Sequence, residues 1–223
     1  MSVSTCTVSW REGIPKIETP RIILRPIQPE DKSAYQKLFL NKIAMASYAG
    51  GPRDISRRFD GWLQRWQWHH FSALAVVDKS NDRVIGHAVL GHGDYEGKID
   101  RGWSEAAVIL HPDYWNKGIG EEIYQSVGAY AKHLSSHGFF VPSDVVESQQ
   151  AEVEKLAEEG MRVHRDGDGK IQWIYLPFTE LRATCHPDNT NAYRLLEMAT
   201  MKNNGSVEAT DRERFLFRFN LKG

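Results

Sequence analysis

The feature that most constrains this chain is a short apolar segment followed at once by a glycine-containing turn and a helix. Residues 106–110 are all apolar, and this run is too short for a helix and is ended by Pro112. Such a run is typical of a buried strand. After the turn, apolar residues recur at three- and four-residue steps over 119–130. The sequence therefore predicts a strand, a turn and a helix in this order.

This strand–turn–helix unit is a candidate anion site, because the first N–H groups of a helix lack internal partners and lie at the positive end of its dipole. Gly118 and Gly120 have no Cβ, so a phosphate can approach the backbone closely, and Lys117 adds a positive charge. Two named phosphate motifs are excluded. Lys117 precedes its glycine, unlike a P-loop lysine, and Ile123 replaces the third glycine of the dinucleotide fingerprint. A purely structural turn remains the alternative.

The letters W-N-K-G-I-G at 115–120 resemble the acyl-CoA pyrophosphate turn of the GNAT acetyltransferases, whose pattern is Q/R-x-x-G-x-G/A. A tryptophan at the first position is similar to the ribosomal-protein N-acetyltransferase branch. That branch tends to begin with T-x-R-L-x-L-R-P, and residues 19–26 read T-P-R-I-I-L-R-P. Two motifs in the same order and spacing are more specific than either alone. The resemblance covers residues 17–135 and 180–219.

The resemblance implies a fold of the α/β (α+β) class. We expect a GNAT-like mixed, mostly antiparallel twisted sheet of about six or seven strands, flanked by helices. A single N-acetyltransferase domain would span 1–223. Residues 139–178 interrupt the family pattern and are expected to be an insertion. Within it, the acidic segment 144–159 predicts a helix, and D-G-D-G at 166–169 predicts the turn of a hairpin.

The remaining elements follow from periodicity and from breakers. Residues 1–16 are polar and mixed and are expected to form a loose lead-in. Three tryptophans, Trp62, Trp66 and Trp68, lie in one predicted helix, where they either pack against the sheet or line an acceptor pocket. We expect strands at 21–27, 74–77, 84–90, 181–185 and 215–219, and helices at 31–40, 55–70 and 190–201.

Acetyl-CoA is the co-substrate that the resemblance implies. In the family the pantetheine arm pairs with the backbone of a splayed central strand, and the pyrophosphate binds the turn. An Asn in a strand–P-x-N–helix element contacts the pantetheine. The positions of this chain that match the family's cofactor-binding residues are Val108, Ile109, Leu110, Trp115, Asn116, Lys117, Gly118, Ile119, Gly120 and Asn189.

Catalysis by direct attack of an amine requires a base, because an amine of pKa about 10 is mostly protonated at neutral pH. Glu105 is the candidate, since histone-acetyltransferase members of the superfamily place a general-base Glu at the equivalent position. The alternative is a solvent-facing Glu. The family's general-acid Tyr corresponds to Leu196 here, and the Ser of the ribosomal-protein branch corresponds to Ala192. Tyr193 on the same helix is therefore the candidate acid.

Composition excludes several functional classes. Lys plus Arg is 28 and Asp plus Glu is 29, so the formal net charge of −1 gives no basic signature for nucleic acid. The two cysteines, Cys6 and Cys185, suggest neither a disulfide framework nor a metal site, and no metal is expected. Neither a signal peptide nor an apolar run of membrane-spanning length is evident. We therefore expect a cytoplasmic protein without a membrane partner.

The sequence thus predicts an N-acetyltransferase that moves an acetyl group from acetyl-CoA to a primary amine. The acceptor is a protein N-terminus or a small molecule. One rival is a catalytically degenerate CoA-binding sensor or scaffold module, and another is a phosphate- or nucleotide-binding protein that uses the same turn. Four points stay open: the acceptor, the length of the acyl group, the role of the insertion, and the oligomeric state, with a homodimer among the alternatives.

Overall fold

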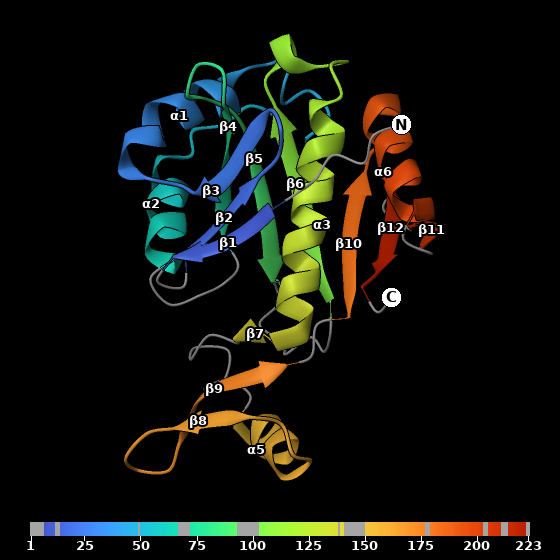
Figure 1. Cartoon of the computed structure of the whole chain (residues 1–223). Coiled ribbons are helices and arrows are strands. Elements are labelled where there is room, and N and C mark those ends of the chain that lie inside the picture. Colours follow the sequence, from blue (N-terminus) through green and yellow to red (C-terminus); the bar gives the residue numbers. More distant parts are fainter. Residues whose placement is uncertain are drawn as a thin grey trace.

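A nine-stranded sheet forms the centre of the structure, a computed structural model that describes residues 7–11, 14–48, 50–66, 72–92, 103–137, 139–140, 150–176, 179–202, 205–210 and 214–221 (Figure 1). The strand order is β1-β2-β3-β4-β5-β6-β10-β12-β11. All neighbours are antiparallel except β6 and β10, which are parallel. The strands are β1 (Thr7–Arg11), β2 (Ile14–Glu18), β3 (Ile22–Pro26), β4 (Ala73–Asp78), β5 (Arg83–His92), β6 (Trp103–Leu110), β10 (Glu180–Cys185), β11 (Ser206–Ala209) and β12 (Phe215–Asn220).

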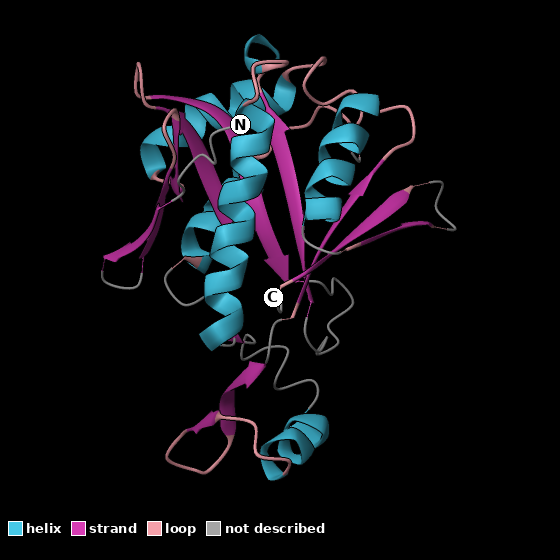
Figure 2. Cartoon of the chain, turned by 45° about the vertical axis from the view of Figure 1, so that its right-hand side comes forward, coloured by secondary structure: helices cyan, strands magenta, loops and turns pink. Residues whose placement is uncertain are grey.

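Helices cover both faces of this sheet (Figures 1 and 2). Helices α3 and α6 pack on one face, whereas α1 and α2 pack on the other. Within the described ranges, no helix combines the length and the apolar composition needed to cross a membrane. The helices are α1 (Lys32–Leu40), α2 (Ser56–Arg65), α3 (Ile119–His137), α5 (Gln150–Glu158) and α6 (Thr190–Lys202), with two short 3-10 helices, η1 (Pro29–Asp31) and η2 (Pro112–Tyr114).

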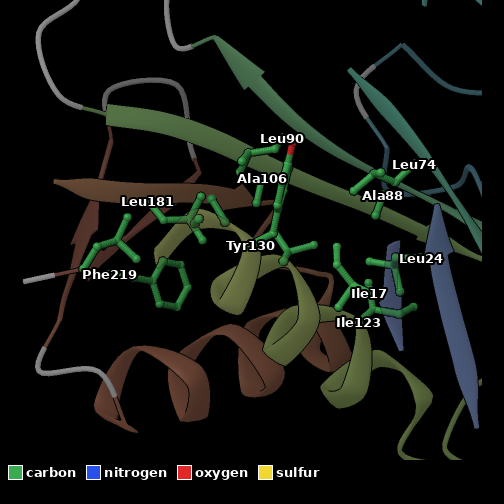
Figure 3. Close-up of a cluster of buried hydrophobic side chains, with 14 of the residues drawn as sticks. Ile17, Leu24, Leu74, Ala88, Leu90, Ala106, Ile123, Tyr130, Leu181 and Phe219 are labelled. Carbon is green, nitrogen blue, oxygen red and sulfur yellow. The ribbon is translucent and has the colours of Figure 1, made fainter. Parts of the chain in front are cut away.

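Strand β4 shows how alternation builds two cores. Its sequence A-L-A-V-V-D is apolar on both faces. Leu74 and Val76 belong to the cluster beneath α3, and Ala75 and Val77 belong to the cluster beneath α1 and α2. Figure 3 shows the first cluster, with Tyr130 of α3 reaching the sheet. Each fully buried Leu or Val stabilises the fold by about 1.5–3 kcal/mol, so a central strand of this kind anchors both layers.

The core beneath α1 and α2 is aromatic and encloses one histidine. His87 of β5 stacks on Trp62 with ring centroids 4.9 Å apart, and it meets the rings of Tyr35 and Phe39 edge-on. Burial lowers the pKa of His87 to about 3, so the ring is neutral. The indole N–H of Trp66 donates to the Ala73 carbonyl at 2.8 Å. Packing against the sheet therefore accounts for both tryptophans, whereas Trp68 lies outside the described residues.

The predicted fold class is confirmed, but the N-terminal segment was predicted wrongly. Residues 7–11 and 14–18 form the antiparallel pair β1–β2, which extends the sheet beyond β3. Strand β1 lies at the edge and is held by its pairing with β2, whereas β2 also buries Ile17 in the cluster beneath α3. Both strands are short and of mixed polarity, so they give little periodic signal. Together with β11, whose side chains are all exposed, these strands explain why the sheet is wider than expected.

Other boundaries differ in detail. Helix α2 ends at Arg65, whereas the sequence predicted a helix as far as residue 70. Residues 67–70 of that prediction lie outside the described residues. Residues 93–102 and 141–149 also lie outside them. Asp31, where the first helix was predicted to begin, is the N-cap residue of α1, but its side chain does not cap the helix. Its carboxylate instead accepts hydrogen bonds from the Arg25 guanidinium at 2.7 and 2.9 Å.

The predicted helix and hairpin of segment 139–178 are present, and they lie beyond one end of the main sheet (Figure 1). Helix α5 packs against a small sheet of order β7-β9-β8, formed by β7 (Phe139–Phe140), β8 (Val163–Arg165) and β9 (Ile171–Leu176). Arg165 and Glu154 join hairpin and helix by an ion pair at 2.7 Å. The segment has apolar side chains of its own to bury, namely Val153, Leu156, Ile171 and Ile174.

Gly86 marks a close approach between strands. A Cβ there would lie 2.7 Å from the Ile109 carbonyl oxygen, beside a register shift between Val76 and Val77.

We expect Gly86→Ala to lower the free energy of unfolding by about 1–3 kcal/mol, because the backbone must move to admit the methyl group. Gly61→Ala on α2 is the control: nothing lies within 4 Å, and we expect a gain of about 0.5–1 kcal/mol. Urea unfolding measures both, and equal stability of Gly86→Ala and the parent protein would contradict this account.

Candidate functional site

The turn after β6 has an unusual backbone. Asn116 and Gly118 both have left-handed φ angles, +58° and +74°. Alternation of left- and right-handed residues turns successive N–H groups toward one side, which makes a concave site for anions. Trp115 supports the turn by donating its indole N–H to the Leu110 carbonyl at 2.8 Å, and Lys117 lies over the Tyr114 ring, 5.8 Å from its centroid.

The two glycines of the turn have different neighbours. A Cβ on Gly118 would meet the Arg21 guanidinium at 3.2 Å in addition to straining its backbone. A Cβ on Gly120 would meet Leu195 of α6 at 3.0 Å, so this glycine allows α3 and α6 to pack closely. The sequence motif therefore serves helix packing as well as the turn, a role that the spacing alone did not indicate.

Strands β6 and β10 diverge from each other (Figure 1). Their parallel pairing covers only Trp103–Glu180, Ser104–Leu181 and Glu105–Arg182. By contrast, β6 pairs with β5 as far as Leu110. From Ala106 onward, β6 therefore has a neighbouring strand on one side only within the described part of the sheet. Both α3 and α6 begin at the end where the strands are apart (Figure 1).

Three predicted cofactor residues lie along this opened stretch. Val108 and Leu110 contact the core beneath α3, and Ile109 contacts the core beneath α1 and α2. The Ile109 carbonyl oxygen faces β5 beside Gly86, and Trp115 already engages the Leu110 carbonyl, so Val108 is the residue best placed to offer backbone groups to an extended ligand. Assignment of these residues to a ligand stays a prediction.

Asn189 is the N-cap of α6. Its Oδ1 accepts the Ala192 N–H at 3.2 Å, and its carbonyl accepts the Tyr193 N–H at 2.9 Å. The cap engages the amide oxygen, whereas a ligand carbonyl would use the amide NH2. The two roles are compatible, so the predicted contact with a pantetheine arm is retained as a prediction.

Glu105 lies at the point where the strands separate. It shares the sheet face of Ile109, four residues on, and thus faces the α1 and α2 side. Thr184 of β10 makes a long 3.5 Å contact from its hydroxyl to the Glu105 carboxylate, and Arg214 donates to the same hydroxyl at 3.3 Å. Burial raises the pKa of Glu105, while Thr184 and the charge of Arg214 partly oppose this shift. A raised pKa makes this carboxylate a stronger base than an exposed one.

Tyr193 packs between α6 and β12. Its ring meets Phe215 and Phe217 edge-on at 4.8 and 5.4 Å. Burial raises the pKa of Tyr193, and the charge of Glu197 on the same helix raises it further. Its role as the acid stays a prediction.

The structure also draws attention to Tyr124, which the sequence analysis did not single out. It lies on α3 and packs against the same core. Burial raises its pKa, and the ionisable groups of Cys185, Tyr48 and Glu105 act in the same direction. Tyr124 is thus within electrostatic range of Glu105. Its helical position, two residues after the buried Glu122, carries no motif, which is why only packing reveals it.

Metal ligands are not grouped here: within the described ranges, no three His, Cys, Asp or Glu side chains are arranged to hold an ion.

Comparison with known proteins gives a family match and several structural neighbours. A family model described as an acetyltransferase (GNAT) domain matches residues 21–202. A GNAT-family acetyltransferase from Bacillus anthracis superimposes with a TM-score of 0.58 and 15% identity, covering 93% of this chain and 99% of that one. Vibrio cholerae spermidine N-acetyltransferase, in complex with CoA and spermine, superimposes with a TM-score of 0.56 and 12% identity. The match covers 89% of this chain and 94% of that one.

A phosphinothricin acetyltransferase from Sinorhizobium meliloti, in complex with AcCoA, gives a TM-score of 0.54 and 13% identity, covering 88% of this chain and 86% of that one. At these identities the superpositions show a shared fold. Together with the family match, they confirm the resemblance drawn from the two sequence motifs.

The pKa shift of Glu105 predicts a pH-dependent stability. Because the folded-state pKa is raised above its unfolded value of 4.5, the stability that Glu105 contributes is present below pH 4.5 and is lost as pH rises through the raised value. The parent protein should therefore lose stability relative to Glu105→Gln as pH rises above 4.5, as measured by urea unfolding.

Glu154→Gln is the matched control. Hydrogen bonding to Arg165 lowers the pKa of Glu154, so the parent protein should gain stability relative to this variant as pH rises. The difference in unfolding free energy between the parent protein and each variant should change with pH, in opposite directions for the two variants. A difference that does not change with pH, or that changes in the same direction for both variants, would contradict the pKa shift of Glu105.

Proposed function

Because the chain belongs to the acetyltransferase (GNAT) domain family and is an acyltransferase, we propose that it transfers an acetyl group from acetyl-CoA to a primary amine. The amine belongs to a protein N-terminus or a small molecule. The observation that carries this proposal is the divergence of β6 and β10 beside the left-handed turn at the start of α3. It combines a strand open to an extended ligand with an anion site at one end of the sheet. We further propose that 1–223 forms one domain in which 139–178 is an insertion.

The chemistry of CoA matches the groups that this site offers. The pantetheine arm is extended and has amide groups, and it would pair with the free side of β6 around Val108, whose backbone groups point away from β5. The amide of Asn189 lies at the start of α6 for a further contact. The pyrophosphate is an anion and would bind the N–H groups of residues 115–120. Gly118 fits this role because a Cβ would fill the turn beside Arg21. Two neighbours with bound CoA or AcCoA support the choice of ligand.

In the proposed reaction the thioester supplies an activated acetyl group, and the amine nitrogen attacks its carbonyl carbon. The new C–N bond forms, the C–S bond breaks, and the nitrogen loses a proton to Glu105, directly or through a water. The products are the acetylated amine and CoA. Burial supports Glu105 as the base, because a raised pKa brings the carboxylate closer to the working pH.

The departing sulfur needs a proton, and two tyrosines compete to supply it. Tyr193 is the residue indicated by the sequence, but its ring packs against β12. Tyr124 interacts electrostatically with Glu105 and with Cys185 at the end of β10. We propose Tyr193 and Tyr124 as alternative donors of this proton.

Ligand binding tests the cofactor assignment directly. A ligand that binds only the folded state stabilises it by about 2.7 kcal/mol at a hundredfold excess over its Kd. We expect acetyl-CoA and CoA to raise Tm, and ATP at the same concentration to leave it unchanged. Equal shifts with CoA and ATP would favour a generic phosphate site, and no shift with either CoA species would oppose the proposal.

Turnover tests the catalytic assignment. Glu105→Gln keeps the shape of the side chain but cannot accept the proton, so kcat with a responsive amine should fall by about 10²–10⁴-fold with little change in the KM for acetyl-CoA. The control is Glu208→Gln, an exposed carboxylate of β11 that pairs with Arg218. A protein that binds CoA but acetylates no amine, with or without Glu105, would instead fit a CoA-binding sensor or scaffold.

A further inference from the structure

Arg21 joins the two sequence motifs that are characteristic of this chain. It precedes β3, and its guanidinium reaches the turn that starts α3, 96 residues further along the chain. Its Nη1 donates to the Lys117 carbonyl at 2.6 Å, and its Nε donates to Glu122 Oε1 at 2.5 Å. One planar side chain therefore connects the strand, the turn and the first turn of the helix.

Glu122 is a buried carboxylate with both oxygens engaged. It is 5% exposed, and its Oε2 accepts the Thr19 hydroxyl at 2.7 Å. The same hydroxyl accepts the Ile22 N–H at 3.1 Å, which ties Thr19 to the start of β3. We call Thr19, Arg21 and Glu122 the Arg21 clamp. Glu122 and Thr19 are buried and Arg21 is about half exposed. Charge-assisted hydrogen bonds are short and directional, so the clamp is suited to fixing geometry.

The clamp determines the orientation of one peptide group. In a trans peptide the carbonyl and the next N–H point in opposite directions. Because Arg21 holds the Lys117 carbonyl, the N–H of Gly118 points away from the guanidinium. The left-handed φ of Gly118 is part of the same arrangement. A turn whose N–H groups are already oriented binds an anion without the cost of ordering them.

The clamp also balances charge. Glu122 lies in the first helical turn, where a phosphate would bind, and its negative charge alone would repel that ligand. Arg21 neutralises this carboxylate and directs it toward β3. Without Arg21, a buried carboxylate would be left without its ionic partner beside the anion site.

We propose that Arg21, held by Glu122 and Thr19, is a positioning residue that orients the Lys117–Gly118 peptide for the pyrophosphate of CoA. This inference rests on the proposed function and extends it, because it assigns a cofactor-positioning role to a residue outside the turn. It also explains why the N-terminal motif accompanies the turn motif in one chain.

Arg25 supplies a matched control. It is the second arginine of the same motif, lies on β3, and forms a two-pronged ion pair with Asp31, which is 5% exposed. Its hydrogen-bond partners, Asp31 and the Pro26 carbonyl, lie at the opposite end of β3 from Arg21. Arg21→Met and Arg25→Met thus each break an ion pair to a buried carboxylate, and only Arg21→Met releases the Lys117 carbonyl.

The test compares Kd for acetyl-CoA, kcat and both KM values for the parent protein, Arg21→Met and Arg25→Met. We expect Arg21→Met to weaken acetyl-CoA binding about tenfold or more, with kcat at saturation and the acceptor KM largely retained. Arg25→Met should lower Tm but keep the parent Kd. Equal Kd values for all three proteins would overturn the proposal.

A second variant separates positioning from folding. Arg21→Met/Glu122→Leu removes the orphaned carboxylate, so it should recover stability lost by Arg21→Met while acetyl-CoA binding stays weak. Recovery of the parent Kd in this double variant would show that Arg21 acts only through charge balance, and would overturn the orienting role.

The last comparison uses S-acetyl-pantetheine, which has the thioester and the pantetheine arm but lacks the pyrophosphate. Arg21→Met should use it with the same kcat/KM as the parent protein. A loss of kcat/KM as large as that seen with acetyl-CoA would overturn the proposal.

If the parent protein binds acetyl-CoA but Arg21→Met binds it equally well, the clamp proposal alone fails. If the parent protein does not bind acetyl-CoA, the proposed function fails and this inference with it.

Discussion

The parallel pairing of β6 with β10 is the constraint on which the proposed site depends. The two strands share three register positions and then separate, while β5 holds β6 along the rest of its length. A strand held on one side stays extended, so its other side can accept a ligand that is itself extended. The separation also places the starts of α3 and α6 at the same end of the sheet (Figure 1).

The two faces of the sheet carry different groups of the proposed site. Beneath α3 and α6, the cluster of Figure 3 fixes the helix whose N-terminus forms the turn. Beneath α1 and α2, an aromatic cluster packs around neutral His87. Glu105 belongs to this second face, next to Thr184. A cofactor held between the strands would thus have the base on one side of it, and the helix that binds its phosphates on the other.

Polar contacts across long sequence separations connect these layers. Arg21 links the start of β3 to the turn before α3, and Thr184 and Arg214 link β10 and the start of β12 to Glu105. The Arg21 contact with Lys117 is exposed, whereas the carboxylate of Glu122 that also holds Arg21 is buried. The apolar layers position these polar groups, and the polar groups in turn define local backbone and side-chain geometry.

The sequence by itself determined the strand–turn–helix unit at 106–130, most helices and strands, and the family, because short-range periodicity and glycine spacing are local properties. It did not indicate β1, β2 or β11, which depend on pairing with neighbouring strands and, for β2, on burial of Ile17 beneath α3. Nor did it indicate Tyr124 or the partnership of Arg21 with Glu122. Arg21 and Glu122 are 101 residues apart, and Tyr124 is marked only by its packing, so the tertiary structure alone decided both. The raised pKa of Glu105 has the same origin, since burial is a property of the folded chain and not of the residue.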